Sequence, residues 1–105
     1  MNSVADAAGA VAGFEPLLQA PARLQVMAVL ANAQEAEFAR LKEITGTSDS
    51  VMSKHLAGLA DAGFIKLRKG ALNGRQRTWA SLTRAGRGTF DTHVAALHRI
   101  VAGQA

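Results

Sequence analysis

The sequence predicts a mainly α-helical domain that carries one small β-hairpin. Apolar residues recur at helical spacing in four segments, which begin near Pro21, Phe38, Ser48 and Thr83. Between the last two segments, short strand-like runs flank a glycine-containing turn, which is the pattern of a hairpin. Residues 63–90, which include this hairpin, hold seven basic residues and no acidic one. The expected order is therefore helix, helix, helix, positive hairpin, helix.

The composition limits the chain to one domain and excludes several kinds of protein. We expect 14–105 to form that domain, and the Ala- and Gly-rich residues 1–13 to be a flexible or a dimer-forming segment. The absence of cysteine rules out disulfides and thiolate metal sites. No apolar run approaches the roughly 20 residues of a membrane span, and the N-terminus lacks the basic start of a signal peptide. We therefore expect a cytoplasmic protein with no membrane partner.

The first two helices are predicted from their apolar spacing and their end signals. Pro21 suits the start of the first helix because its missing N–H is not needed in the first turn, and this helix should end near Asn32. A short linker that contains Gln34 and Glu35 follows. The second helix is shorter, is ended by Gly46, and is marked by three apolar residues: Phe38, Leu41 and Ile44.

The helix expected from Ser48 to Ala62 has two contrasting faces. Ser48 is a good N-cap residue. One face is an apolar stripe for the core: Met52, Leu56 and Leu59. The opposite face is small and polar with one cation: Ser50, Ser53, Lys54 and Ala57. Short side chains let a backbone approach base edges, and a cation meets a phosphate or a guanine, so this face suits the major groove of duplex DNA.

The hairpin is expected to have strands at 64–69 and 75–82, with its tip at 70–74. Trp79, the only large aromatic of the return strand, is expected to anchor a core or an interface. The seven cations of this region suit a DNA backbone or a minor groove: Lys66, Arg68, Lys69, Arg75, Arg77, Arg84 and Arg87. In the last helix, which Thr83 should cap, four residues at 4-3-4 spacing form a seam for another helix: Phe90, Val94, Leu97 and Val101.

From about Phe14 to Val101 the chain resembles the winged helix-turn-helix regulators of the MarR and ArsR type, in particular the small ones that are little more than a DNA-binding domain. The segment SDSVMSKHL (48–56) resembles the start of a recognition helix, and LADAGFI (59–65) resembles its exit into the first wing strand. GRQRTW (74–79) resembles the return strand of the wing, and LTRAG (82–86) the hinge into the last helix. Many relatives have Pro and Glu where Arg84 and Ala85 stand here.

The resemblance implies a homodimer that binds an inverted-repeat operator in double-stranded DNA and represses transcription. The terminal helices would form the dimer, helped by Phe14, Leu17 and Leu18. The residues that would contact DNA lie on the recognition helix and the wing: Ser48, Ser50, Val51, Ser53, Lys54, His55, Lys69, Arg75 and Arg77. No cofactor, metal or catalytic residue is implied, so an enzyme is not expected.

Three alternatives stay open at this point. A winged helix can bind protein instead of DNA, because a fold does not fix a function. A small-molecule effector, which the sequence does not identify, could control release from DNA. Asp91 and His93 form the Asp-x-His pair with which ArsR-type metal sensors begin a site, but the further ligands are missing. We therefore expect His93 and His98 to be interface or surface residues.

Overall fold

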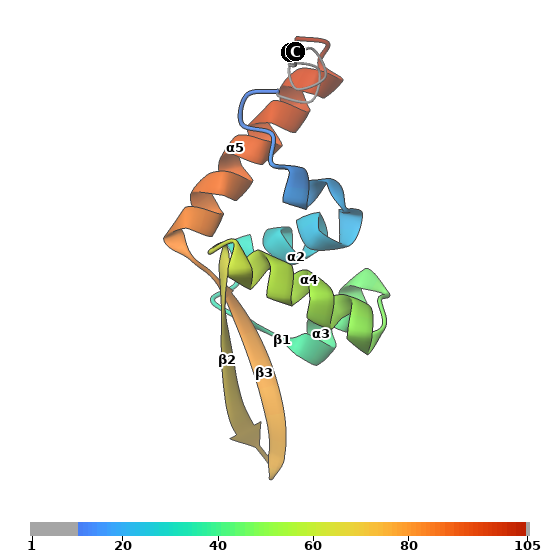
Figure 1. Ribbon diagram of the computed structural model, residues 1–105, viewed down its shortest axis with the longest axis vertical. Coiled ribbons are helices and arrows are strands. Elements are labelled where there is room, and N and C mark those ends of the chain that lie inside the picture. The colour runs from blue at the N-terminus through green and yellow to red at the C-terminus, as the bar shows by residue number, and fades with distance from the viewer. Residues whose placement is uncertain (1–10, 105) are drawn as a thin grey trace.

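The computed structural model describes residues 11–104 (Figure 1). In chain order the elements are η1 (Pro16–Gln19, a 3-10 helix), α2 (Pro21–Ala31), β1 (Ala36–Glu37), α3 (Phe38–Thr45), α4 (Asp49–Asp61), β2 (Ile65–Leu72), β3 (Arg75–Leu82) and α5 (Arg84–Val101). The prediction of a mainly helical domain with a hairpin is confirmed. The prediction that residues 1–13 are flexible or form a dimer concerns mostly residues outside the described range.

Helices α2, α3 and α4 pack around the core, with the base of the hairpin against them (Figure 1). The buried residues of the core come from η1, the three helices and the two long strands: Leu18, Val26, Met27, Leu30, Leu41, Met52, Leu56, Leu59, Ile65 and Ala80. Leu18 is only 1% exposed within this core, so the expectation that it holds a second protomer is wrong. The short helix η1 turns it inward, which helical spacing alone did not reveal.

The ends of the helices follow the predicted signals. The Ser48 hydroxyl accepts a hydrogen bond from the amide of Val51 at the start of α4, and the Thr83 hydroxyl accepts one from Gly86 at the start of α5. Gly46 ends α3 with a φ of 70°, a left-handed conformation that costs glycine little. These caps fix where α4 begins and therefore which of its residues face outward.

The hairpin is longer and its turn tighter than predicted. Strands β2 and β3 pair antiparallel from Ile65↔Leu82 to Leu72↔Arg75, so only Asn73 and Gly74 form the turn. Both have positive φ, 54° and 77°, as a two-residue hairpin turn with the right twist requires. Gly70, which was placed in the tip, lies within β2 instead. The Asn-Gly pair, and not the first glycine, was the turn signal.

A third, very short strand was not predicted. Strand β1 pairs with β3 through Ala36↔Ala80 and Glu37↔Trp79, giving a sheet of order β1-β3-β2. Two residues are too few to show an alternating pattern, so this segment read as linker. The pairing places the acidic residues at 35–37 beside the hairpin.

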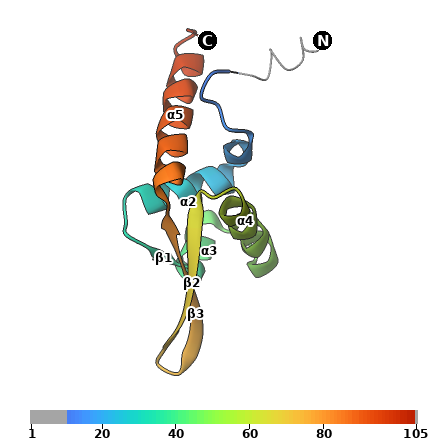
Figure 2. The ribbon, with the colours of Figure 1, turned by 60° about the vertical axis from the view of Figure 1, so that its left-hand side comes forward.

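The hairpin and α5 extend in opposite directions from the helical body, as Figures 1 and 2 show, and the described chain measures 54 × 25 × 24 Å. Where α5 leaves β3, Gly86 is buried against the backbone of Phe64, and a Cβ on it would lie 2.0 Å from the Phe64 carbonyl oxygen. The Thr83 hydroxyl donates to the Gly63 carbonyl at 2.6 Å. No helix among the described residues has the length and apolar character needed to cross a membrane.

Candidate nucleic-acid interface

The polar face of α4 points to solvent, as predicted. Its residues are exposed, while the apolar stripe on the other side is in the core: Ser48, Ser50, Val51, Ser53, Lys54 and Ala57 outside, Met52, Leu56 and Leu59 inside. Val51 leaves 42% of its surface exposed although it is β-branched and apolar. An exposed helix face of short side chains with one lysine is the geometry that entry into a major groove requires.

His55 borders this face but is half-buried. Its Nδ1 lies 3.4 Å from Nη1 of Arg23, a residue of α2 whose Nε donates to the Leu17 carbonyl. Burial first, and the positive charge of Arg23 second, lower the pKa of His55. The imidazole is therefore neutral at pH 7, and with Nδ1 facing Arg23 its Nε2–H is available as a donor.

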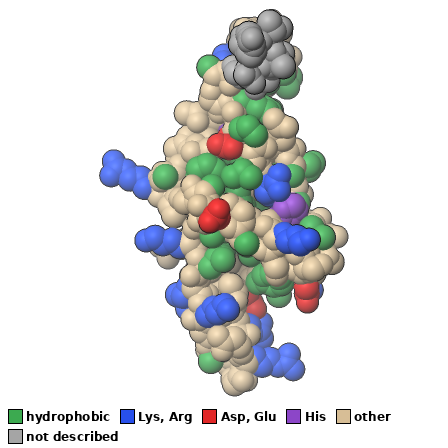
Figure 3. Space-filling model, viewed as in Figure 1, with side chains coloured by type: hydrophobic (Ala, Val, Ile, Leu, Met, Phe, Trp, Pro, Cys, Tyr) green, Lys and Arg blue, Asp and Glu red, His purple; other side chains and the backbone are tan. Residues whose placement is uncertain are grey.

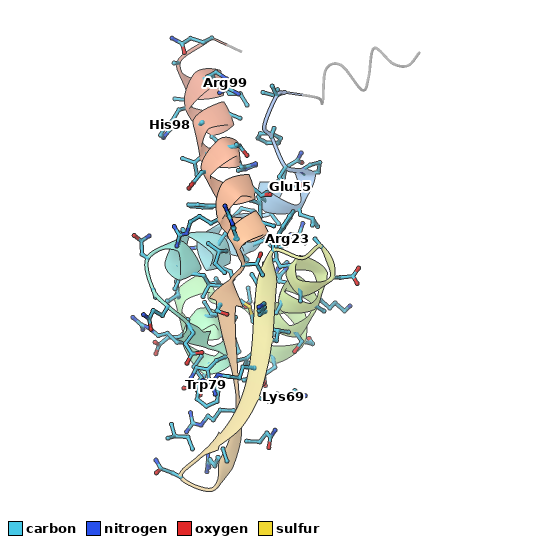
Figure 4. All side chains as sticks on the ribbon, turned by 90° about the vertical axis from the view of Figure 1, so that its left-hand side faces the viewer. Glu15, Arg23, Lys69, Trp79, His98 and Arg99 are labelled. Carbon is cyan, nitrogen blue, oxygen red and sulfur yellow. The ribbon has the colours of Figure 1, made fainter. Side chains whose placement is uncertain are left out.

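Lys69 and Thr78 share the hairpin face that points to α4. They are register partners, and with Ser53, Ala57 and Leu67 they line a cleft of about 240 Å³ between α4 and the hairpin. Figure 4 shows Lys69 on the side of the hairpin where α4 lies and Trp79 on the other side. Lys69 is exposed, as is Arg75 beside the turn. Lys69 thus lies beside α4, whereas Arg75, on the opposite face of the hairpin, lies next to the turn and lines the cleft between α3 and β3.

Arg77 lies differently from the other predicted contacts. Its side chain is only 29% exposed, and its Nη1 donates to Glu37 of β1 at 2.5 Å. Its Nε is buried without a hydrogen-bond partner. With Lys42 and Asp49, which form an ion pair of their own, it lines a polar cleft of about 450 Å³ between α3 and β3. The structure therefore brings Arg77 to an acidic partner and not to the exposed tip.

A second arginine of the hairpin is also bound within the protein. Arg68 donates to both carboxylate oxygens of Glu35, at 2.7 and 3.3 Å, and its guanidinium lies 4.3 Å from the centre of the Trp79 ring. Trp79 is half-buried beneath it. Trp79 is neither in the core nor among the residues packed against it, so the prediction that it anchors a core is not borne out. The Arg68 guanidinium instead covers one face of its ring.

The basic side chains project along the hairpin and beside α4 in Figure 3, whereas hydrophobic side chains cover more of the centre and of the α5 end. The acidic residues that balance part of this charge come from 35–37, which the sequence pattern did not place there. Arg23 and Thr78 were missed as well. Both come from elements far from α4 in sequence, and only the packing brings them beside it.

The histidines of α5 do not form a metal site in the described part of the chain, where no group of three or more His, Cys, Asp or Glu is placed to hold an ion. The expectation that His93 lies at a surface or interface is wrong. It is 1% exposed, its Nδ1 accepts from the Glu15 amide at 2.9 Å, and Phe14 packs on its ring. It fastens the N-terminal segment to α5, a role that its position on the helix could not reveal.

Comparison with known proteins identifies the family. The profile of the winged helix DNA-binding domain matches residues 22–101, most of the chain. The chain belongs to this family. It is thus a winged helix DNA-binding protein, in which the hairpin β2–β3 is the wing. An uncharacterized protein of Methanocaldococcus jannaschii is 31% identical over 72 residues, which are 69% of this chain and 78% of that protein.

Solved structures show that the fold is that of transcriptional regulators. The transcriptional regulator homologue of Pyrococcus horikoshii OT3 has a TM-score of 0.75 at 23% identity, over 83% of this chain and 86% of its own. A mutant of MarR from E. coli in complex with operator DNA has a TM-score of 0.68 at 16% identity, over 85% of this chain and 63% of its own. The predicted resemblance to MarR-type regulators is confirmed at the level of the fold.

Proposed function

We propose that this winged helix protein is a sequence-specific transcriptional regulator that binds double-stranded DNA as a homodimer at an inverted-repeat operator and represses transcription by excluding polymerase. One observation carries the proposal: the recognition helix α4 exposes a face of short polar side chains with Lys54, next to a wing that carries no acidic residue. The MarR mutant whose fold this chain shares was solved with operator DNA. A regulator of chromosomal genes would act in the cytoplasm.

The proposed contacts divide into those that read sequence and those that hold the backbone. Residues on the exposed face of α4 would meet base edges or the adjacent phosphates: Ser48, Ser50, Val51, Ser53, Lys54 and His55. Lys69 and Arg75 would meet phosphates, the first in the cleft beside α4 and the second at the wing tip. Arg77 was also predicted as a contact, but it is bound to Glu37.

The homodimer is supported by the apolar side of α5. Phe90, Val94 and Leu97 are half-buried within one protomer, and near the C-terminal end Ile100 and Val101 leave 41% and 85% of their surface exposed. Such a seam on a helix that extends away from the body suits another helix of the same kind. A two-fold dimer would place two copies of α4 in successive major grooves, one helical turn or a multiple apart.

The decisive experiment is selection of bound fragments from random duplex DNA by the purified protein. We expect an enriched palindromic motif whose half-sites are spaced by about one helical turn, or a multiple. On that motif, Lys54→Ala should weaken binding by about 1–3 kcal/mol if it contacts a base edge. Arg40→Ala, which removes the same charge from an exposed site on α3 outside the proposed contacts, is the control and should have little effect. Failure to enrich any motif would contradict sequence-specific binding.

A second candidate function, release from DNA by a small molecule, is favoured by an apolar groove. About 450 Å³ in volume, it lies between the N-terminal segment and α5, lined chiefly by Phe14, Leu18, Leu24, Leu97 and Ile100. Gln19 and His93 also line it, but these two polar residues do not identify a ligand. A screen of small apolar molecules for loss of operator binding would test it. If no compound weakens binding, the groove is not an effector site.

A further inference from the structure

The cations of the wing differ in whether a carboxylate pairs with them. Side chains alternate between the faces of a strand, so Lys69 and Thr78 face α4, while Arg68, Arg77 and Trp79 lie on the other face. That other face also holds Lys66 and Arg75 by the same alternation. Of its cations, Arg68 and Arg77 are paired with carboxylates of the segment that leads into and forms β1. Within residues 11–104, Lys66, Lys69 and Arg75 have no carboxylate within ion-pair distance.

Arg68 is held in three ways. Two of its N–H groups donate to Glu35, and one face of its guanidinium is covered by Trp79. Paired donation to a carboxylate uses the same planar edge of the guanidinium that would grip a phosphate. Arg68 can therefore bind a DNA phosphate through that edge only by leaving Glu35.

Arg77 is held in a less exposed place. The side chains of Arg77 and Glu37 are 29% and 25% exposed, and the backbone of Glu37 is fixed by its pairing with Trp79 in the sheet. If Arg77 turned to a phosphate, the Glu37 carboxylate would stay behind without its counter-charge in a mostly covered site. Separating one member of a shielded ion pair is costly, because the remaining charge is poorly solvated.

We propose that Glu35 and Glu37 limit the affinity of the wing for DNA by withholding Arg68 and Arg77 from the phosphate backbone. The wing then engages DNA through Lys69 and Arg75, and the paired arginines hold the hairpin to β1. This inference rests on the proposed function, because it concerns the same surface, but it adds two acidic residues that set the strength of binding. They lie at 35–37, outside the recognition helix and the wing.

The pairing of Arg68 and Arg77 should be visible in how DNA affinity depends on salt. Affinity for duplex DNA falls with salt in proportion to the number of phosphates that the protein neutralises, with a slope of about 0.9 per phosphate. An arginine already neutralised by a carboxylate adds little to that number. Replacing the carboxylate with the amide of the same shape removes the competing charge and makes the arginine available.

The test compares Glu35→Gln and Glu37→Gln with Glu43→Gln. Glu43 is an exposed carboxylate on α3 that pairs with Arg40, so its replacement changes the net charge equally without touching the wing. Binding to a random-sequence duplex is measured over a salt series. We expect Glu35→Gln and Glu37→Gln each to bind more tightly than Glu43→Gln and to steepen the salt slope by about 0.9. Equal behaviour of all three, or weaker binding by a folded Glu37→Gln variant, would overturn the proposal.

Two further measurements keep the test decisive. Should Glu37→Gln fail to fold, as judged by Trp79 fluorescence, Arg77→Gln replaces it, and the inference then requires an unchanged salt slope. Elution from heparin, a polyanion without base sequence, ranks the variants independently of any operator. If the heparin order is as expected but no duplex is bound, the proposed function fails and the charge pairing stands. If the protein binds duplex DNA but all the variants bind it equally, the proposal about the charge pairs fails and the proposed function stands.

Discussion

The helical body and the wing are held together by different interactions. The body, formed by α2, α3 and α4, buries leucine, methionine and valine side chains almost completely. In the wing, from Lys66 through Trp79, no side chain is fully buried, and its longer-range polar contacts are the two ion pairs to residues 35–37. Stability is therefore concentrated in the body and charge in the wing. Substitutions should affect the two properties separately, which offers several ways to test the comparison.

The largest expected effect is on stability, when a leucine is truncated to alanine in the body and, for comparison, in the wing. Leu59 of α4 is 0% exposed and Leu72 of the wing is 46% exposed. Leu59→Ala should lower the free energy of unfolding by about 2–5 kcal/mol, because it leaves a cavity in the core. Leu72→Ala should change it by no more than about 0.5 kcal/mol. Urea denaturation followed by circular dichroism measures both, and similar losses would contradict the comparison.

The junction between the wing and α5 should respond to a single methyl group. Gly86→Ala would push a Cβ into the Phe64 carbonyl and should cost about 1–3 kcal/mol or more. Gly88→Ala, two residues further along α5, meets nothing within 4 Å and should instead gain about 0.5–1 kcal/mol, because alanine favours a helix over glycine. Thermal melts of the two variants should therefore shift in opposite directions.

A change confined to the wing should alter DNA binding without altering stability. Arg75→Gln removes an exposed cation beside the turn, so it should lower the salt slope of duplex binding by about one contact and leave the unfolding free energy nearly unchanged. Fluorescence anisotropy over a salt series measures the slope. A marked loss of stability would show that the wing carries more of the fold than its burial indicates.

The smallest effect is expected from pH. Burial lowers the pKa of His93, with the Glu15 carboxylate opposing the shift to a lesser degree. The unfolded chain then binds the proton more readily, so stability is complete above the ordinary value of 6.5 and falls as the pH drops below it. His93→Gln should flatten this fall, whereas His98→Gln, at an exposed site, should not. Melting temperatures across this range give the comparison.

The helices and the outward face of α4 could be predicted because their signals are local. Apolar spacing, caps such as Ser48 and Thr83, and Gly46 act within a few residues of the structure they determine. The proposed DNA contacts stay predictions, but the exposure of all but His55 and Arg77 agrees with them.

What the sequence did not reveal depends on contacts between distant residues. Glu37 and Arg77 are 40 positions apart, and Glu15 and His93 are 78 apart. No spacing rule connects such pairs, since packing alone brings them together. The two-residue strand β1 and the inward turn of Leu18 belong to the same class. In contrast, the Asn73-Gly74 turn was present in the sequence as a recognised signal and was placed too broadly.

The close approach of Gly86 to Phe64 has a consequence for how this architecture can vary. Because main-chain atoms make this contact, it can persist while exposed side chains of the wing or of α5 change. Substitutions on the exposed surface of the wing and on the exposed side of α5 can therefore accumulate separately, provided position 86 keeps no side chain. A redesign of this chain can therefore change either surface while glycine is retained at position 86.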